Sequence, residues 1–580
     1  MVENGLVFGV VAIVTIVVAG VFSRKLGVAA PLILIIVGFA FSYIPGAPTE
    51  VNHNIVLLGL LPPILYAAAI NVPVVDLRRN FSTISALSVG LVLITAFGTG
   101  FLLFVIFPDL TLAGGIALGA VISPTDAVAA TALGKKLGLP PRLVTILEGE
   151  SLVNDATALV LLRSAILAIS SAVTFWGVIG DFAFAVSVAI VIGLGVGFVT
   201  VRVRTKLRDP ILDTTISLAV PFIAFIPAEA VGASGVLAVV AAGLYSGHNS
   251  AKRFTAQARI SERLNWRTAQ FVLENGVFLL MGVEISAIIA DVLAKDLSVT
   301  AAVLYGLFMV ATIVVIRFLF IGPLLLMLRR RGQLAEERQS RVRAMLDRMR
   351  RRADSDPMFA KRQDRAERVF QRRELDIKQL KAEGLGWRGG LILGWSGMRG
   401  VVTLAAAQSL PEDIPYRSQL VLIAFTVAVV TLLVQGGTLP WVIRMSGIRG
   451  SDRVADRREL AELLDEMGTA GLAVLENPEF TLPDGQEIDS GVIERVRNDT
   501  LLSAESAWER ARFGAGDEGI AKSPHQQYRS LRQEVLQAER AALLEARSTG
   551  SYPSRVLSRA QAMLDLEETR LEQIDNPGAS

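Results

Sequence analysis

The stretch Leu147-Glu148-Gly149-Glu150-Ser151-Leu152-Val153-Asn154-Asp155-Ala156-Thr157 places carboxylates inside an apolar run that extends over residues 143–170. On a helix, residues four apart share a side, so Glu150 aligns with Asn154 in one polar stripe. Ser151 and Asp155 form a second stripe beside it. Ionisable groups in hydrocarbon cost about 2.5–3.5 kcal/mol each on insertion scales, so they need partners and usually mark a pathway. We therefore expect this face to line a protein interior. A role in helix packing alone is the alternative, although two carboxylates so close together exceed what packing needs.

The composition of the whole chain indicates that this run crosses a membrane. Of its 580 residues, 52% are hydrophobic and 19% are charged, and the mean hydropathy is +0.50; charged residues are about a quarter of a soluble protein. About thirteen apolar runs could each cross a hydrocarbon core of ~30 Å as a helix. They cover residues 4–22, 28–46, 55–72, 82–107, 111–133, 143–170, 175–201, 210–227, 230–247, 268–290, 298–328, 386–410 and 418–444. The chain is thus predicted to be an all-α polytopic membrane protein with a transmembrane domain over residues 1–445.

The residue types that are missing exclude several kinds of chemistry. The chain has no cysteine and three histidines, His53, His248 and His525. The absence of cysteine excludes disulfides, thiolate metal sites and thiol nucleophiles, and the sequence shows no evident pair of a nucleophile and a base. We expect no enzymatic activity and no cofactor. The net charge of +3 lies largely in loops between spans, where topology explains it without a nucleic-acid partner.

Basic residues alternate between successive loops, and this alternation predicts the orientation. They concentrate in every second loop: Arg24 and Lys25; Arg78 and Arg79; Lys135, Lys136 and Arg142; Arg202, Arg204, Lys206 and Arg208; Lys252, Arg253, Arg259, Arg263 and Arg267. Only Lys295 and Arg417 break the pattern. Because Lys and Arg near span ends favour the cytoplasm, we predict a multi-pass protein of the cell membrane, with its N-terminus outside and its C-terminus in the cytoplasm. The first run lacks a basic n-region and a clear cleavage site, so it is read as a retained span.

Two segments are too charged to lie in a membrane. Residues 329–385 are predicted to be a charged cytoplasmic loop within the transmembrane domain, with one or two solvated helices. Residues 446–580 are predicted to be a cytoplasmic helical tail, because Leu and Ala recur there at helical spacing among charges. Binding of a partner or of acidic lipid and a merely solvated state both remain open, and no partner of the tail is identified.

The span at 111–133 is interrupted by Val121-Ile122-Ser123-Pro124-Thr125-Asp126-Ala127. Pro124 has no amide hydrogen, so it frees carbonyl groups at the depth of the membrane centre. Transporters present such carbonyls and helix ends to ions, and Thr125 and Asp126 would add hard oxygen ligands that suit small cations. An ordinary proline kink, with Asp126 as a helix cap, is the alternative.

A second interruption, Gly394-Trp395-Ser396-Gly397-Met398-Arg399-Gly400, lies in the span at 386–410. Two interrupted helices in corresponding positions are typical of transporters built from inverted repeats. Arg399 is expected to offset the partial negative charge of exposed carbonyls. Arg317, in the middle of an apolar span, needs a carboxylate partner, and Glu150 is the candidate; snorkelling to an interface is the alternative. For Glu274, which is also intramembrane, a structural hydrogen bond and a pathway role both remain open.

Five motifs in this order resemble those of the sodium/proton exchanger family, monovalent cation:proton antiporters, on its bacterial side. They are Leu61-Pro62-Pro63, Ser123-Pro124-Thr125-Asp126, Glu150-Ser151-Leu152-Val153-Asn154-Asp155, Phe271-Val272-Leu273-Glu274-Asn275 and Gly397-Met398-Arg399-Gly400. The resemblance covers roughly residues 1–445, and the loop and the tail lie outside it. It implies thirteen spans in two inverted repeats, with crossed broken helices at the two interruptions, and a homodimer.

The resemblance also implies roles for single residues. Asp155 would bind the cation or the proton, assisted by Ser151, Thr125, Asp126 and Asn154, with Na⁺ held at Asp155, Ser151 and Thr125. Glu150 and Arg317 would form a structural ion pair, while Pro124 and Arg399 would support the broken helices. Asn154 stands where electrogenic relatives carry a second aspartate, which implies electroneutral exchange. Asp126, as a second carboxylate able to titrate, could change that stoichiometry.

A physical mechanism follows from the burial of Asp155. A low-dielectric cavity disfavours the charged carboxylate, so a proton or a cation neutralises it, but not both at once. If the site crosses the membrane only when neutralised, this competition produces exchange by alternating access. We therefore predict an antiporter that exchanges Na⁺ or Li⁺ for H⁺. A K⁺/H⁺ antiporter is the alternative within this class, and a cation channel is the alternative outside it.

Overall fold

The computed structural model describes residues 2–26, 29–44, 55–170, 175–207, 209–353 and 385–448, together with short pieces of the tail. Helices and the turns between them account for these residues, and none of them forms a strand. The chain divides into two compact units, Met1–Gly450 and Ser451–Ser580. In the second unit, the described pieces are helical and include an ion pair between Arg532 and Glu567. Most of residues 446–580 and the part of the charged loop from 354 to 384 lie outside the described residues.

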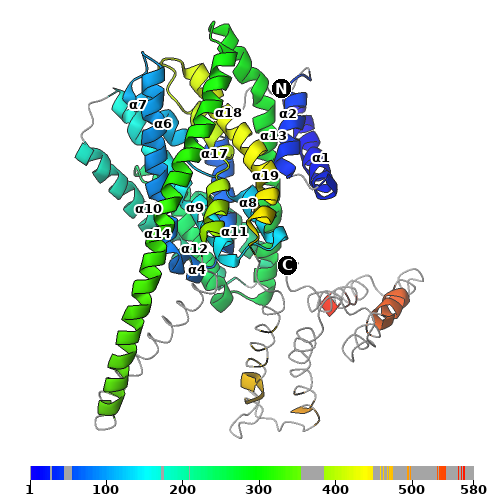
Figure 1. The fold of residues 1–580 in the computed structure, drawn as a ribbon. Coiled ribbons are helices and arrows are strands. Elements are labelled where there is room, and N and C mark those ends of the chain that lie inside the picture. The colour runs from blue at the N-terminus through cyan, green and yellow to red at the C-terminus, as the bar shows by residue number, and fades with distance from the viewer. Residues whose placement is uncertain are drawn as a thin grey trace. The chain divides into compact units, whose positions relative to one another are not determined.

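The helices of the first unit follow the apolar runs of the sequence. In chain order they are α1 (Val2–Leu26), α2 (Ala30–Phe41), the π-helix η1 (Ile55–Leu60), α3 (Leu61–Asn71), α4 (Val74–Arg79), α5 (Phe81–Ser85), the π-helix η2 (Ala86–Leu91), α6 (Val92–Ile106), α7 (Leu112–Ile122), α8 (Val128–Leu137), α9 (Pro141–Ser170), α10 (Phe175–Arg204), α11 (Pro210–Ala230), α12 (Gly235–Arg253), α13 (Ala256–Ala294), α14 (Val299–Ala353), α16 (Trp387–Trp395), α17 (Val401–Gln408), α18 (Arg417–Thr431), the π-helix η3 (Leu432–Gly436) and α19 (Gly437–Ser446). Figure 1 shows their arrangement.

Seven helical segments among the described residues are long and apolar enough to cross a membrane. They are Phe81–Ile106, Pro141–Ile169, Trp176–Arg204, Pro210–Ala230, Gln257–Ala294, Val299–Arg330 and Arg417–Ser446. Shorter apolar helices occur at Phe8–Ser23, Ala30–Phe41, Ile55–Asn71 and Leu112–Ile122. The prediction of an all-α membrane protein is therefore confirmed for the described residues, whereas thirteen spans and two inverted repeats stay predictions.

Two helices are longer than the apolar runs that identify them. α13 begins at Ala256 rather than near residue 268. The residues before 268 form an amphipathic helix, because Arg263 and Arg267 are exposed on one side and Glu262 and Trp266 are buried on another. α14 continues to residue 353, beyond the predicted span end at 328 and past its neighbours (Figure 1). Residues 329–353 contain no proline and consist mainly of strong helix formers such as Arg, Glu, Leu and Ala, so the helix continues through them.

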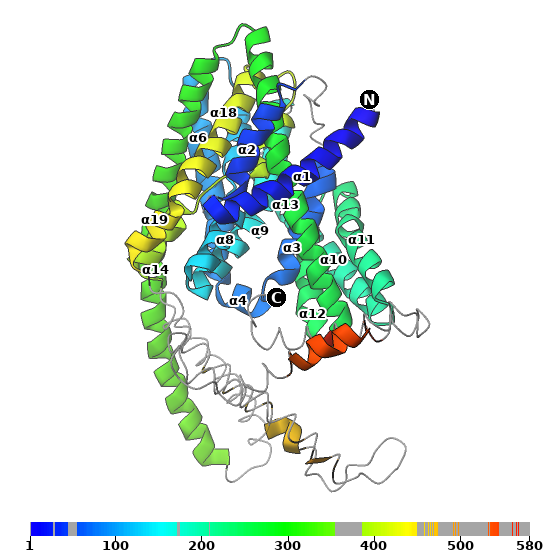
Figure 2. The ribbon, with the colours of Figure 1, turned by 90° about the vertical axis from the view of Figure 1, so that its right-hand side faces the viewer.

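The helices of the first unit gather in two groups around α9. α10, α11 and α12 pack together beside α3, while α6, α14 and α18 pack on the other side of the unit, and α1 crosses α2 and α13 obliquely (Figure 2). Where α2 meets α13, Gly38 and Gly282 face each other. A Cβ at Gly38 would lie 2.9 Å from the Cα of Gly282, so only glycine permits this close approach.

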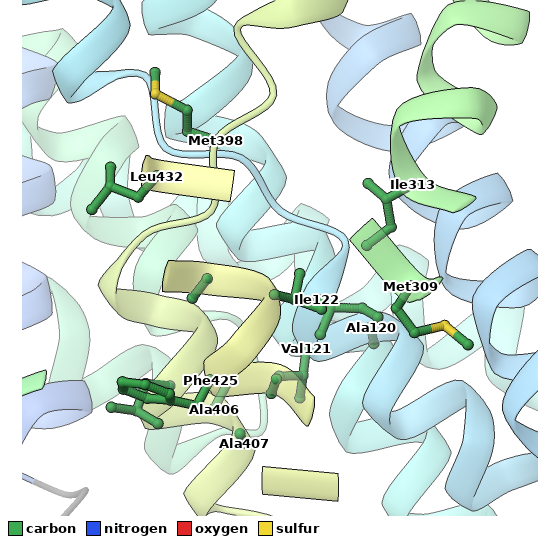
Figure 3. Packing of buried hydrophobic residues seen from close by; sticks show 14 of the residues in the cluster. Ala120, Val121, Ile122, Met309, Ile313, Met398, Ala406, Ala407, Phe425 and Leu432 are labelled. Carbon is green, nitrogen blue, oxygen red and sulfur yellow. The ribbon is translucent and has the colours of Figure 1, made fainter. Parts of the chain in front are cut away.

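Both sequence interruptions are breaks in helices. α7 ends at Ile122 and α8 begins at Val128, while α16 ends at Trp395 and α17 begins at Val401. The amide of Asp126 in the first break donates to the carbonyl of Met398 in the second at 2.7 Å. Figure 3 shows the two non-helical segments crossing beside Met398, surrounded by apolar side chains. The crossing brings four helix ends to one place.

A buried charge cluster joins the ends of α10, α11 and α13. The guanidinium of Arg204 donates to both carboxylate oxygens of Asp213 at 2.8 Å and to Glu262 at 2.6 Å. Ser217 donates to Glu262 at 3.2 Å and accepts a hydrogen bond from the Trp266 indole at 2.8 Å. One cation therefore serves two buried carboxylates.

We expect Arg204→Met to destabilise the protein by about 3–5 kcal/mol, because it leaves Asp213 and Glu262 buried without a cation. The measurement is the thermal unfolding of the detergent-purified protein. Arg202→Met, two residues away on the same helix and exposed, is the matched control and should unfold like the wild type. Equal unfolding temperatures for the two variants would contradict the assigned role of the cluster.

Candidate functional site

The polar stripe of α9 faces the first helix break and the middle of α14. The Glu150 carboxylate accepts two hydrogen bonds from the Arg317 guanidinium, at 2.6 and 3.0 Å. Only 2% of Glu150 and 1% of Arg317 are exposed. The Arg317 Nε also donates to the carbonyl of Leu393 in α16 at 2.9 Å. This ion pair ties α9 to α14 and to the helix that precedes the second break.

Thr125, in the first break, is fixed by residues of α9. Its hydroxyl donates to Glu150 Oε1 at 2.9 Å, and the Asn154 amide donates to the Thr125 carbonyl at 2.9 Å and to its hydroxyl at 3.0 Å. The Thr125 hydroxyl thus has partners within the protein, while its carbonyl keeps a second lone pair. Asn154 Oδ1 is buried and accepts no hydrogen bond from the described residues.

Asp126 lies directly before the helix that follows the first break. One carboxylate oxygen of Asp126 accepts a hydrogen bond from the Val128 amide at 2.8 Å, at the start of α8. Asp126 thus satisfies one amide of this helix from the position before its N-cap residue, Ala127. The Ala127 amide donates to the hydroxyl of Ser151 at 3.4 Å, so Ser151 also lies at this break. A Cβ at Gly400 would lie 2.6 Å from the Cβ of Asp126, so the second break passes directly against Asp126.

Asp155 lies one helical turn along α9 from Ser151 and is 8% exposed. Its charge is close enough to that of Asp126 to interact with it. Leu152 and Ala156, which lie within one turn of Asp155 on α9, pack with residues of α3 and α12. Asp155 therefore lies between the crossing breaks and the group formed by α3, α10, α11 and α12. Among the described residues, no cationic side chain forms an ion pair with it.

Arg399 lies on carbonyl groups at the helix breaks. Its Nε donates to the carbonyl of Ile122, at the end of α7, at 3.0 Å, and its guanidinium also donates to the carbonyl of Gly397. Its own amide donates to the hydroxyl of Thr431 at 3.1 Å. A buried cation therefore meets the negative end of the α7 dipole. Pro124 is buried within the break itself.

Several polar contacts were not predicted from the sequence. Arg163 on α9 forms an ion pair with Glu229 at the end of α11, and Glu229 also accepts a hydrogen bond from the Gly235 amide at 2.9 Å. The Arg204 cluster was also missed, because Arg204 belongs to a basic run that topology alone explains. In the sequence, Arg163 is recognisable only as a charged residue within an apolar run. That position does not indicate which residue pairs with it. No group of three or more metal-ligating side chains is arranged to hold a resident metal ion in the part of the chain that the structure describes.

Comparisons with known proteins agree with the resemblance seen in the motifs. The pattern of the family described as "Sodium/hydrogen exchanger, transmembrane" matches residues 11–445. An uncharacterized Na(+)/H(+) exchanger of Mycobacterium tuberculosis is 28% identical over 98% of this chain and 97% of its own. A "Sodium, potassium, lithium and rubidium/H(+) antiporter" of Bacillus subtilis is 28% identical over 50% of this chain and 45% of its own.

A solved structure supports the fold. The sodium proton antiporter MjNhaP1 of Methanocaldococcus jannaschii superposes with a TM-score of 0.54 at 15% identity, covering 77% of this chain and all of that one (100%). The members of the matching family are cation/proton exchangers of the membrane rather than enzymes, so the expectation of no enzymatic activity is confirmed. With the family pattern matching three quarters of its length, the chain belongs to the sodium/hydrogen exchanger family.

Proposed function

We propose that this protein exchanges Na⁺ or Li⁺ for H⁺ across the cell membrane, at Asp155, by alternating access. Family membership supports cation/proton antiport; the ion, the stoichiometry and the residues are the proposal. The observation that carries it is a buried carboxylate, Asp155, without a cationic partner among the described residues, beside two crossing helix breaks. A buried carboxylate of this kind is stable only when a proton or a cation neutralises it.

The charged groups around the breaks support the exchange of one monovalent cation for one proton. Three carboxylates, Asp126, Glu150 and Asp155, lie there with two guanidiniums, Arg317 and Arg399, and these five groups together carry a net formal charge of −1. One proton or one monovalent cation brings this net charge to zero. Moving a neutral assembly through a low-dielectric region costs much less than moving a charged one. Sodium and protons would therefore compete for one charge, and the exchange would be electroneutral.

The oxygens near Asp155 form a suitable environment for a dehydrated sodium ion. Asp155 and Ser151 share one stripe of α9, and the Thr125 carbonyl and Asp126 come from the break opposite. Asn154 positions that carbonyl, and its buried Oδ1 is a further oxygen in the same region. In this proposal Na⁺ is held at Asp155, Ser151 and Thr125, while Asp126 and Asn154 complete the surroundings. Hard oxygen donors of this kind suit Na⁺ and Li⁺.

Other residues would hold this arrangement in place. The Glu150–Arg317 ion pair fixes α9 against α14, and Pro124 and Arg399 support the breaks. We further propose that the protein is a homodimer, as the family resemblance implies. The loop charges predict that its N-terminus lies outside and its C-terminus in the cytoplasm. The domain boundaries at 445 and 446, and a cytoplasmic location of the loop and the tail, are part of the same proposal.

Asp155→Asn should abolish exchange, because an amide takes up neither the proton nor the cation. The measurement is dye-reported proton movement in everted membrane vesicles on adding Na⁺, Li⁺, K⁺ and Ca²⁺ in turn, with insertion checked by immunoblot. Asp181→Asn, the same change at an exposed position of α10, is the control and should exchange like the wild type. Activity retained in Asp155→Asn would show that the site is misassigned.

The same cation series identifies the substrate. A response to Na⁺ or Li⁺ supports the proposal, and a response to K⁺ alone would make the protein a K⁺/H⁺ antiporter instead. Competition for one carboxylate also predicts that the apparent KM for Na⁺ rises as the pH is lowered, because protons then occupy Asp155. An apparent KM that is independent of pH would contradict the competition.

Electroneutral exchange predicts a turnover that does not depend on membrane voltage. The test is Na⁺-driven proton movement in proteoliposomes whose potential is clamped with valinomycin and K⁺ gradients. Equal rates at both polarities are expected, because the loaded site carries no net charge in either direction. A rate that changes with the potential would exclude one-for-one exchange.

Gly400→Ala should lower the exchange rate by about tenfold or more, because the added methyl group overlaps Asp126 and forces the crossing segments apart. The comparison is Gly437→Ala in α19, where a Cβ meets nothing within 4 Å. Both variants are assayed for transport in vesicles at matched protein levels. Full activity in Gly400→Ala would show that the close contact between the two breaks is dispensable.

A further inference from the structure

Glu274 lies near the middle of α13 and has no part in the mechanism above. It is partly exposed, and one of its carboxylate oxygens accepts a hydrogen bond from the Gln270 amide at 2.7 Å. Among the described residues, no positively charged side chain forms an ion pair with it. A carboxylate halfway along a membrane-crossing helix is costly, so it needs either a cation partner or access to water.

The side of α13 that carries Glu274 faces the interior of the protein. Gln270, Glu274, Val277, Met281 and Glu284 recur at intervals of three and four residues, so they lie along one stripe. Contacts at two places show where this stripe points. Val277 packs against Val56 of η1 and Ala405 of α17, and Gln408 of α17 donates to Glu284 at 2.9 Å.

The first break lies close to this stripe. Asp126 lies against Gly400, directly before α17, and Ala405 of α17 packs against Val277 on the stripe. The charge of Asp126 also acts on Glu274 and on Asp155. α17 begins at Val401, directly after the break that passes against Asp126. Glu274 and Asp155 therefore approach the crossing of the breaks from different helices.

Apart from Tyr66 of α3 and Tyr305 of α14, the ionisable groups in the apolar parts of the elements around α13 are paired or lie at the ends of those parts. η1, α2 and α17 contain none, and α3 contains only Tyr66. In α11, Asp213 pairs with Arg204 and Glu229 pairs with Arg163. In α14, Arg317 pairs with Glu150, and in α18, Arg417 donates to the carbonyls of Leu410 and Gln408. The charged residues of α1, which are Glu3, Arg24 and Lys25, lie at its ends. Gln270 and Asp126 are thus the polar groups shown to act on Glu274.

We propose that Glu274 is a positioning residue on the path to the exchange site, where its negative charge draws monovalent cations and protons toward Asp126 and Asp155. This inference rests on the proposed exchange at Asp155. A fixed charge in a low-dielectric channel raises the local concentration of its counter-ions. Glu274 therefore acts on how readily the site is loaded and does not bind the transported ion within the site itself.

Replacing Glu274 by glutamine tests this role, because it removes the charge and keeps the shape. In proteoliposomes we expect Glu274→Gln to raise the apparent KM for Na⁺ by roughly threefold to tenfold. The maximal rate should stay within about twofold of the wild type, since Asp155 is intact. The pH profile at low Na⁺ should also shift, because proton delivery to the site loses the same attraction. A purely structural hydrogen bond between Gln270 and Glu274 would leave both the KM and the pH profile unchanged.

Two further variants make the result decisive. Glu274→Asp keeps the charge and should have a KM within about twofold of the wild type. This variant also provides the test if Glu274→Gln fails to insert into the membrane. In that case, a KM of Glu274→Asp as high as the value expected for Glu274→Gln would overturn the proposal. Asp291→Asn, a carboxylate lost near the end of the same helix, should leave the KM unchanged. An unchanged KM in Glu274→Gln, with the wild type active, overturns the role of Glu274 alone, whereas no exchange by the wild type overturns the proposed function.

Discussion

The structure depends on the ion pair between Glu150 and Arg317. Both side chains are buried, and two hydrogen bonds at 2.6 and 3.0 Å join them. The pair satisfies one carboxylate of α9 and, through the Leu393 carbonyl, fixes α9 relative to the helix before the second break. Removing either partner would leave a buried charge unpaired, which costs about 3–5 kcal/mol. Because Arg317 pairs with Glu150, it does not pair with Asp155, and no other cationic side chain of the described residues does so. We propose that a proton or a cation taken up from outside the protein balances the charge of Asp155.

The polar groups at the two helix breaks are satisfied mainly by one another and not by Asp155. Arg399 neutralises the carbonyl end of α7, and Asp126 satisfies the amide at the start of α8. The exposed helix ends that the crossing creates are thus largely stabilised by the protein's own residues. Asp155 remains, a buried carboxylate in a setting that favours its neutral state, and among the residues that the structure describes no cationic side chain pairs with it. In such a setting a proton and a small cation are alternatives, and we propose that their competition is the basis of exchange.

The sequence could predict the helices and the location of the polar groups, because hydrophobic runs and prolines act locally. It also limited the partners of Arg317, since few carboxylates lie at that depth. It did not predict that α14 continues to residue 353, because the apolar run ends before the helix does. Nor did it predict the Arg163–Glu229 pair or the cluster around Arg204, since these contacts depend on how helices distant in sequence are rotated and stacked. The hydrogen bonds of Thr125 to Glu150 and Asn154 were hidden for the same reason.

In the mechanism that we propose, a sodium ion and a proton compete for Asp155. This competition can be measured as proton release on Na⁺ binding to the purified protein, by titration calorimetry in buffers with different ionisation enthalpies. We expect the displacement of close to one proton for each Na⁺ bound at a pH where Asp155 is protonated, and none in Asp155→Asn. Sodium binding to the wild type at that pH without proton release, or the same release from Asp155→Asn, would contradict it.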